Sequence, residues 1–194
     1  MLDHEIGTHF LRRYNERFQV WHQKRDKYQL KYCIKSEEGL ACVNQLVRTA
    51  WDGKHPFLYR EALNYYASFM ASKLSFVELF NDIEKFIDCK KSRWKFTLRQ
   101  KRGMIDTSKP GGLYKDQCYL KGAVMFLRQR KKIDLAGLFT GKISIEDLNK
   151  PKIRKVINTE EIKLPSFALN LQKYSQALDV IVRTNFIDTL PPLE

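Results

Sequence analysis

Residues with the potential for chemistry are gathered near the start of the chain, in the stretch HEIGTH, His4 to His9. Two histidines that project from one face of a helix can bind a metal ion, and an adjacent glutamate can act as general base. The usual spacing of such histidines is four residues, whereas His4 and His9 are five apart. The stretch therefore predicts a metal site only if the helix departs locally from α geometry.

A π-type turn would reconcile this spacing with a single ion. On a regular α-helix, residues five apart are rotated by about 140° from each other, so the two imidazoles could not bind one cation. In a π-turn, positions i and i+5 return towards one face, and such turns are enriched at functional sites. Gly7 lies between the histidines, where a departure from α geometry costs least. We therefore expect a π-type bulge within HEIGTH.

Catalytic zinc needs three protein ligands and one open position, and the sequence SEEGLA (residues 36–41) offers the third ligand. Glu38 is favoured over Glu37 because it lies farther into the expected helix and precedes Gly39, where another backbone can approach closely. The alternative is that both glutamates only favour the positive end of a helix. Taken with HEIGTH, the pattern favours Glu38 as ligand and Glu5 as general base for a zinc-activated water.

The remaining histidines and cysteines form no comparable pattern. His22 lies in a polar segment and His55 precedes a proline in a turn, so we interpret both as surface residues. The cysteines are scattered, with no CxxC pair, which indicates reduced thiols rather than disulfides or a four-cysteine zinc site. They are Cys33, Cys42, Cys89 and Cys118.

The composition is that of a globular protein with an excess of positive charge. Hydrophobic residues make up 43% of the 194 residues, and 35 Lys and Arg outnumber 22 Asp and Glu, for a formal net charge of +13. No apolar run has the length of a membrane span, and the first residues lack signal-peptide features, so we expect a cytoplasmic protein. The charge favours an anionic partner, which could be nucleic acid, a membrane surface or an acidic polypeptide.

Helical spacing of apolar residues dominates the chain, and strand-like alternation is rare. The sequence therefore predicts a mainly α fold, organised as a single helical domain that carries the HExxxH and Glu zinc site. Ser36 and Ser75 are expected N-caps, and GMIDTSKPGG (residues 103–112) is an expected loop. The helices are expected over residues 3–18, 37–51, 57–72, 76–88, 90–102, 115–132 and 166–185, with short turns over 133–158.

Several separated motifs occur in an order that resembles a known family. They are HEIGTHFLR, SEEGLA, RQKRGMIDTSKPGGLYKDQCYLKG and LPSFALNLQKY. From His4 to about Asp188 the chain resembles the microtubule-associated tyrosine carboxypeptidases and the bacterial QEGLA-motif proteins. The resemblance implies a zinc metallocarboxypeptidase that removes the C-terminal tyrosine of α-tubulin in the cytoplasm, on microtubules. It implies His4, His9 and Glu38 as Zn²⁺ ligands and Glu5 as catalytic base.

A carboxypeptidase of this kind must also recognise a free α-carboxylate, for which Arg or Lys is the natural partner. Arg102 and Lys115, which flank the glycine-rich loop, are the candidates, and Tyr119 could donate a hydrogen bond to the developing oxyanion. The alternative is that Arg102 belongs to a general basic face and that Tyr119 packs in the core. The positive charge would attract the glutamate-rich tail of α-tubulin.

The resemblance further implies that residues 1–194 are part of a catalytic domain, because the family's domain extends upstream of HExxxH. We therefore expect the C-terminal part of a larger α+β metallopeptidase domain, weakly active or inactive as this fragment. The alternative function is a non-catalytic basic helical module that binds microtubules or nucleic acid. It leaves HEIGTH and SEEGLA unexplained, so nucleic acid ranks lower as a partner, and no membrane partner is expected.

Overall fold

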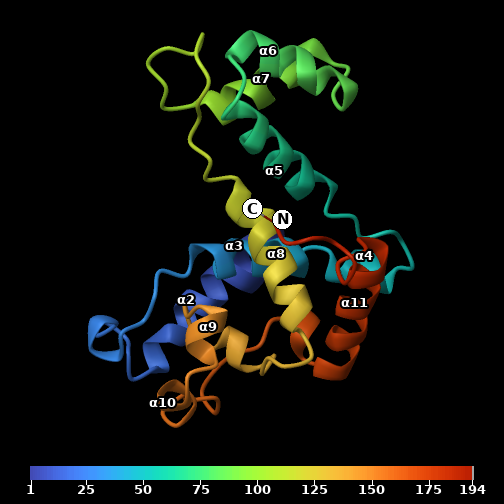
Figure 1. Ribbon diagram of the computed structural model, residues 1–194. Helices are drawn as coiled ribbons and strands as arrows, with labels where there is room; N and C mark the ends of the chain where they lie inside the picture. Colours follow the sequence, from blue (N-terminus) through green and yellow to red (C-terminus); the bar gives the residue numbers. More distant parts are fainter. Residues whose placement is uncertain (194) are drawn as a thin grey trace. The chain divides into compact units, whose positions relative to one another are not determined.

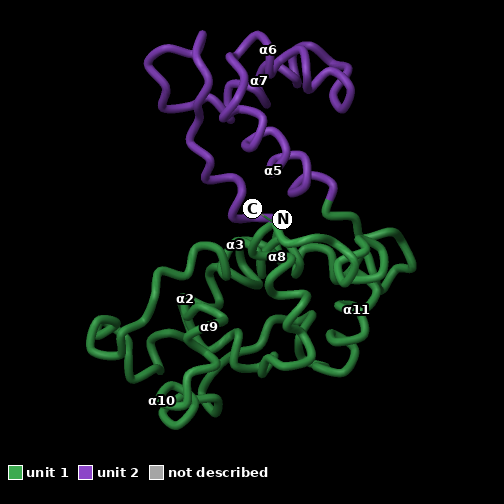
Figure 2. Tube along the Cα trace, viewed as in Figure 1, with its two compact units in different colours: residues 1–58, 121–194 green, residues 59–120 purple. Residues whose placement is uncertain are grey.

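The computed structural model of the protein describes residues 1–193 and consists of helices joined by turns and loops (Figure 1). No β-strand occurs in this described part, so the predicted mainly α class is confirmed. The chain forms two compact units (Figure 2). The first unit comprises residues 1–58 and 121–194, and the second comprises residues 59–120. Among the described residues, no helix has both the length and the apolar character needed to cross a membrane.

The first unit begins with one continuous helical run that changes its winding along the way. It passes from α1 (Leu2–His4) into a π-helical segment (Glu5–Phe10), then into α2 (Leu11–Asn15) and a final 3₁₀ turn (Glu16–Phe18). The predicted helix over residues 3–18 is therefore confirmed, and so is the π-type winding within HEIGTH.

The SEEGLA stretch lies in α3 (Ile34–Asn44), which is followed by α4 (Val47–Trp51). The predicted N-cap at Ser36 is wrong, because α3 begins three residues earlier than predicted, at Ile34, with Cys33 as its N-cap residue. The Ser36 hydroxyl instead accepts a hydrogen bond from the backbone N–H of Ile145, at 3.1 Å. The Ser36 oxygen that would cap the helix locally is therefore bonded to a backbone group far along the chain.

The rest of the first unit is built on aromatic packing. Phe139, Phe167 and Tyr174 are buried together, with ring centroids between 5.9 and 6.3 Å apart. The last helix, α11, begins later than predicted because the Asn170 side chain caps it by accepting from the backbone N–H of Lys173. The elements here are the end of α8 (Gln117–Gln129), a 3₁₀ turn (Gly137–Phe139), α9 (Ile145–Leu148), α10 (Pro151–Arg154), a 3₁₀ turn (Ser166–Ala168) and α11 (Leu171–Thr184).

The second unit is a small helical cluster with its own apolar core. It consists of α5 (Tyr59–Ala71), α6 (Phe76–Asp82), a 3₁₀ turn (Ile83–Lys85), α7 (Lys90–Lys101) and the start of α8. The core residues are Leu63, Ala67, Ala71, Leu79 and Ile83. The predicted cap at Ser75 is confirmed as a reciprocal capping box with Glu78.

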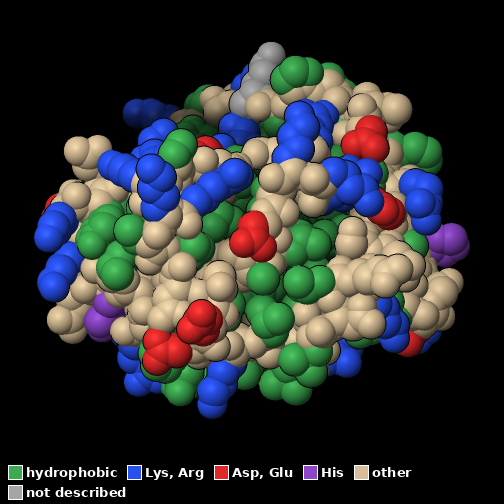
Figure 3. Space-filling model, turned by 90° about the horizontal axis from the view of Figure 1, so that it is seen from below, with side chains coloured by type: hydrophobic (Ala, Val, Ile, Leu, Met, Phe, Trp, Pro, Cys, Tyr) green, Lys and Arg blue, Asp and Glu red, His purple; other side chains and the backbone are tan. Residues whose placement is uncertain are grey.

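Helix α7 is rich in Lys and Arg, but only some of these side chains are exposed to solvent. Arg93 and Lys101 are buried, and the Lys101 ammonium donates to the backbone carbonyls of Ala71, Leu74 and Lys109. These bonds tie the predicted 103–112 loop to the end of α5. Elsewhere the positive charge is spread out: on the face shown in Figure 3, Lys and Arg are distributed widely, whereas Asp and Glu occur in a few small groups.

Candidate metal centre

His4, His9 and Glu38 converge in the first unit. The Glu38 Oε2 atom lies 3.4 Å from His9 Nε2 and 3.8 Å from His4 Nε2, and the ligand atoms of all three residues lie within 4.8 Å of one another. The two imidazole rings are 5.0 Å apart between centroids and nearly perpendicular, at 76°. The π-turn therefore brings together side chains that a regular α-helix would hold apart.

The donor set and its spacing fit a zinc ion. Zinc bonds to nitrogen and oxygen of about 2.0–2.1 Å, at tetrahedral angles, place neighbouring donor atoms roughly 3.3 Å apart. The separations of 3.4 and 3.8 Å from Glu38 are close to this value, and the two histidine nitrogens lie within 4.8 Å of each other. Two neutral imidazoles and one carboxylate are also a ligand combination of catalytic zinc sites, which keep a fourth position open.

Glu5 lies beside this cluster without belonging to it. Its Oε1 atom is 3.9 Å from His4 Nε2, and its side chain is 61% exposed, which is the largest exposure in the group. A solvent-accessible carboxylate next to a metal ligand can exchange protons with water and substrate. The role of general base for Glu5 stays a prediction.

Glu37 bonds to a candidate ligand, His9, whereas its neighbour Glu38 is itself a candidate ligand. The Nδ1–H group of His9 donates to Glu37 Oε1 at 2.8 Å, which leaves His9 Nε2 directed at Glu38. A carboxylate that binds the far nitrogen of a ligand histidine fixes its tautomer and orientation. From the sequence alone, Glu37 is only the lesser candidate ligand. The sequence signal for the orienting role of Glu37 is the pair Glu37–Glu38. Consecutive residues of a helix point about 100° apart, so the two carboxylates can bind different partners.

Glu37 is itself held by two cations. The Arg12 guanidinium, whose side chain is 1% exposed, pairs with Glu37 Oε2, and the Lys142 ammonium lies 3.1 Å from Oε1. Arg12 also donates to the backbone carbonyls of Leu138 and Ile143, each at 2.7 Å. The arginine thereby links the π-turn helix, α3 and the segment before α9 around a single carboxylate.

These contacts set the charge states around the cluster. Burial alone would raise the pKa of Glu37, but the Arg12 charge and the His9 hydrogen bond outweigh it and lower that pKa to about 2. In the absence of a cation, hydrogen bonds to Glu37 and then Glu38 raise the pKa of His9 to about 9. Burial, followed by the nearby His9, lowers the pKa of His4. A cation at this cluster therefore competes with a proton for His9 Nε2.

A buried chain of hydrogen bonds supports the π-turn from behind. The Tyr174 hydroxyl donates to Asn44 Oδ1 at 2.6 Å, Asn44 Nδ2 donates to Thr8 Oγ1 at 2.9 Å, and Thr8 Oγ1 donates to the Asp3 carbonyl at 2.8 Å. The last bond spans five residues, which is the repeat of a π-turn. Because Thr8 lies between the two histidines, its hydroxyl reinforces the winding that their spacing requires.

Gly39 and Gly122 allow α3 and α8 to cross at backbone contact. A Cβ atom on Gly39 would lie 2.1 Å from the carbonyl carbon of Gly122, and one on Gly122 would lie 1.9 Å from the Lys35 carbonyl oxygen. No side-chain rotation can relieve contacts of this kind, since the obstructing atoms belong to the main chain. The close approach predicted at Gly39 is thus confirmed, and it fixes the residue next to Glu38.

The comparisons with known proteins agree with one another. The sequence profile of the family "Microtubule-associated tyrosine carboxypeptidase" matches residues 1–188. The chain is 41% identical, over 97% of its length, to human "Microtubule-associated tyrosine carboxypeptidase 1", and 40% identical, over 97%, to the rat protein of that name. It is 41% identical, over 95%, to mouse "Putative tyrosine carboxypeptidase MATCAP2".

The chain belongs to the microtubule-associated tyrosine carboxypeptidase family. It spans 35 to 40% of the length of these curated relatives.

The motifs that resemble the microtubule-associated tyrosine carboxypeptidase family divide between the two units. HEIGTH, SEEGLA and LPSFALN gather in the first unit: a Cβ atom on Gly7 would lie 2.8 Å from the Phe167 ring, and Arg48 donates to both Asp3 and Ser166. The long motif around the glycine-rich loop lies mainly in the second unit. The family's late motif therefore supports the π-turn directly.

The candidate residues for carboxylate recognition, Arg102, Lys115 and Tyr119, all lie in the second unit. There Arg102 Nη2 donates to Asp116 Oδ1 at 3.0 Å, so its guanidinium is partly engaged. Their roles in substrate binding, proposed from the resemblance to this family, stay predictions. His22 and His55 do not belong to the metal cluster, as expected from the sequence.

Proposed function

We propose that the protein is a zinc-dependent carboxypeptidase that removes a C-terminal tyrosine from an acidic polypeptide tail, such as that of α-tubulin. One observation carries the proposal: the convergence of His4, His9 and Glu38 across a π-turn, with the exposed Glu5 carboxylate at its edge. The names of the relatives, which describe tyrosine carboxypeptidases associated with microtubules, support the reaction and an association with microtubules.

A bound Zn²⁺ would supply Lewis acidity, which polarises a peptide carbonyl and lowers the pKa of water. Glu37 and Arg12 hold the His9 imidazole with its Nε2 lone pair directed at the cluster. Glu5 takes a proton from the attacking water at its carboxylate and returns it to the nitrogen of the departing tyrosine. Its exposure allows it to contact both groups in turn.

Substrate attraction follows from the charge of the chain. A net charge of +13 raises the local concentration of a glutamate-rich tail and accelerates its association at low ionic strength. Arg102 and Lys115 are the candidates for the terminal carboxylate, and Tyr119 is the candidate donor to the developing oxyanion. The alternative is a basic module that binds microtubules without cleaving them. It accounts for the charge but does not explain why His4, His9 and Glu38 converge.

The decisive experiment measures metal content and turnover on the same samples. The wild-type protein should retain about one zinc per chain and release tyrosine from a tail peptide, at the low rate expected of part of a larger catalytic domain. The Glu5→Gln variant should retain the zinc but lose roughly 10²–10⁴-fold in kcat, because only the proton carrier is removed. A non-catalytic module would show no turnover in either protein.

Two matched variants test whether His9 is a zinc ligand. His9→Ala should lose most zinc affinity, whereas His55→Ala, which removes an exposed histidine outside the cluster, should bind zinc like the wild type. Equal zinc content in both variants would refute the assignment of His9 as a ligand.

A further inference from the structure

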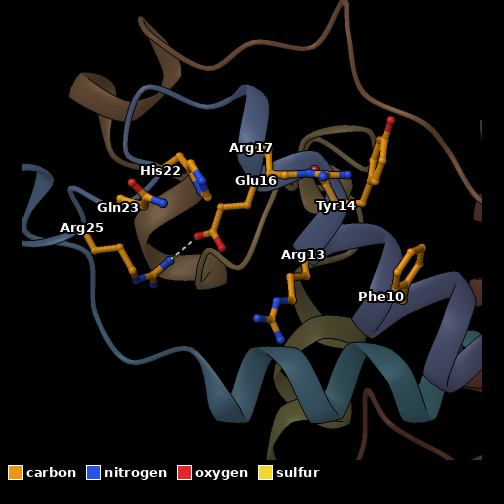
Figure 4. A pocket seen from close by; sticks show the side chains of 8 residues that line it. All are labelled: Phe10, Arg13, Tyr14, Glu16, Arg17, His22, Gln23 and Arg25. Carbon is orange, nitrogen blue, oxygen red and sulfur yellow. Dashed lines mark hydrogen bonds and ion pairs between the residues drawn. The ribbon is translucent and has the colours of Figure 1, made fainter.

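A pocket of about 500 Å³ lies in the first unit, beside the helix that carries His9. Figure 4 shows its lining side chains, which come from the end of the π-helical segment, α2, the following 3₁₀ turn and the segment around residues 22–25. Three arginines and two aromatic rings, Phe10 and Tyr14, line this pocket, together with a single carboxylate, Glu16. We refer to it below as the arginine pocket.

The one carboxylate in the arginine pocket is already neutralised. Glu16 Oε1 accepts from Arg25 Nη1 at 2.7 Å, and the same guanidinium donates to the Lys142 carbonyl. Arg13 is exposed and makes no hydrogen bond or ion pair with any residue that the structure describes. Two positive charges, those of Arg13 and Arg17, are therefore left without a carboxylate partner among residues 1–193.

Arg17 is held in an orientation suited to binding. Its guanidinium carbon lies 4.1 Å above the Tyr14 ring centroid, and its Nε donates to the Tyr14 carbonyl at 3.3 Å. Stacking on an aromatic face restricts the guanidinium while leaving the terminal nitrogens for a carboxylate. Binding an anion there therefore costs less side-chain entropy than binding to a free arginine.

The arginine pocket adjoins the metal cluster along one helix. Arg13 follows His9 by four residues, which places it about 6 Å farther along the axis and on nearly the same face. In Figure 4 the Arg13 side chain points away from α2 towards α3, the helix that carries Glu38. An extended peptide advances about 3.3–3.6 Å per residue, so 6 Å corresponds to roughly two residues of substrate.

We propose that the arginine pocket is a subsite for acidic side chains that precede the cleaved bond of the substrate, with Arg13 and Arg17 as the carboxylate-binding residues. The inference rests on the proposed carboxypeptidase function and adds a sequence preference to it. Arginine binds carboxylates through paired hydrogen bonds. The Phe10 and Tyr14 rings offer apolar contact to the methylene groups of glutamate.

The test compares two synthetic peptides that both end in tyrosine. One carries glutamates at the residues preceding the cleaved bond, and the other carries glutamines there. Affinities are measured by fluorescence anisotropy with zinc-loaded Glu5→Gln protein, in which binding is separated from turnover. Arg13→Gln with Arg17→Gln is the test variant, and Arg183→Gln, which removes an exposed charge on α11, is the control.

The double variant should bind the glutamate peptide about tenfold more weakly than its parent, because two charge-assisted contacts near the surface are lost. The glutamine peptide should bind all the proteins equally, and Arg183→Gln should resemble the parent. In a catalytically intact background, KM for the glutamate peptide should rise while kcat changes little. Circular dichroism spectra that match the parent would confirm that the variants fold.

An equal loss for both peptides, or no loss for either, would overturn the subsite. So would a short polynucleotide that displaces the glutamate peptide at equal charge concentration, since the pocket would then be a general phosphate site. The proposed function can fail separately. If wild-type protein cleaves neither peptide while charge-dependent binding at Arg13 and Arg17 persists, the carboxypeptidase assignment falls and the acidic-peptide site remains.

Discussion

Arg12 in the first unit and Lys101 in the second are both buried cations, but their polar partners differ. In the first unit, Arg12 and Glu37 form a buried ion pair that also holds His9, a residue of the metal cluster. In the second unit, the buried Lys101 donates to three backbone carbonyls. Arg12 thus orients a candidate metal ligand through Glu37, whereas Lys101 fastens a loop.

The two units also differ in how far apart in the sequence the residues joined by polar contacts lie. Arg12, Asn15 and Tyr174 bond to groups more than 100 residues away, so the first unit's network joins distant segments around the cluster. The ion pairs from Arg99 and Arg102 to Asp116 join residues at most 17 positions apart. We therefore expect changes in the first network to alter metal affinity, and changes in the second to alter only local stability.

The largest effect is expected from Glu37→Gln, which keeps the shape of the side chain and removes its charge. Arg12 would be left buried without a counter-charge, which costs about 3–5 kcal/mol of unfolding free energy. Zinc affinity should fall by about 10–100-fold, because the histidine loses its orienting carboxylate. Chemical denaturation and chelator competition measure the two quantities.

Glu146→Gln is the matched control for this change. It removes the same charge from an exposed position on α9, so stability should change by less than about 0.5 kcal/mol and zinc affinity should not change. A loss of stability in Glu37→Gln with wild-type zinc affinity would show that the buried ion pair serves the fold alone.

Gly39→Ala should be the next most damaging change. The added methyl group would meet the backbone of Gly122 at 2.1 Å, so α3 and α8 would have to separate. We expect a loss of about 3 kcal/mol in thermal or chemical unfolding, at the upper end for overpacked sites. Zinc affinity should also fall because Glu38 moves with the helix.

Lys35→Ala, an exposed truncation on the same helix, should leave stability nearly unchanged. If Gly39→Ala unfolds at the wild-type temperature, the close crossing of the two helices is not a constraint on the fold.

Much of this arrangement can be predicted from the sequence where the signal is local. The spacing of His4 and His9, with Gly7 between them, predicts the π-turn because only that winding unites residues five apart. Gly39 indicates a close backbone approach for a similar reason, since glycine alone lacks the atom that would clash. The capping box at Ser75 likewise depends on residues three positions apart.

The features that the sequence does not reveal depend on partners far along the chain. Ser36 matches the local pattern of a helix cap, but its hydroxyl accepts a hydrogen bond from the backbone of Ile145. No local sequence pattern predicts that contact. The role of Glu37 depends on Arg12 and Lys142, which approach only when the segments fold together. Side chains assembled by tertiary structure are thus the part of a site that periodicity does not predict.

Thr8→Val tests whether the hydrogen-bond chain behind the π-turn contributes to the cluster. Valine matches the shape of threonine but cannot accept from Asn44 or donate to the Asp3 carbonyl. The unmet polar groups should cost about 2 kcal/mol of unfolding free energy, and zinc affinity should fall several-fold as the winding loosens. Thr8→Ser, which keeps the hydroxyl, should restore both; an equally weak serine variant would show that the methyl group matters more than the hydrogen bonds.

The smallest effect is expected in the second unit, from Asp116→Asn. Burial raises the pKa of Asp116, but hydrogen bonds from Arg99 and Arg102 outweigh it and leave the pKa below its usual value. A lowered folded-state pKa adds stability above the unfolded-state pKa of about 3.9, and this stability is lost as the pH falls through the folded-state pKa. Since both arginines are more than a third exposed, the neutral-pH cost should be only about 1 kcal/mol.

Amide hydrogen exchange over residues 59–120 measures this change locally. Wild-type protection should decline below about pH 4, whereas the Asp116→Asn variant should show lower protection at neutral pH and a flatter acid dependence. Zinc affinity measured at pH 7 should equal that of the wild type, because Asp116 bonds only within its own unit. A fall in zinc affinity would mean that the second unit's ion pairs also support the metal cluster, and the contrast between the units would fail at that point.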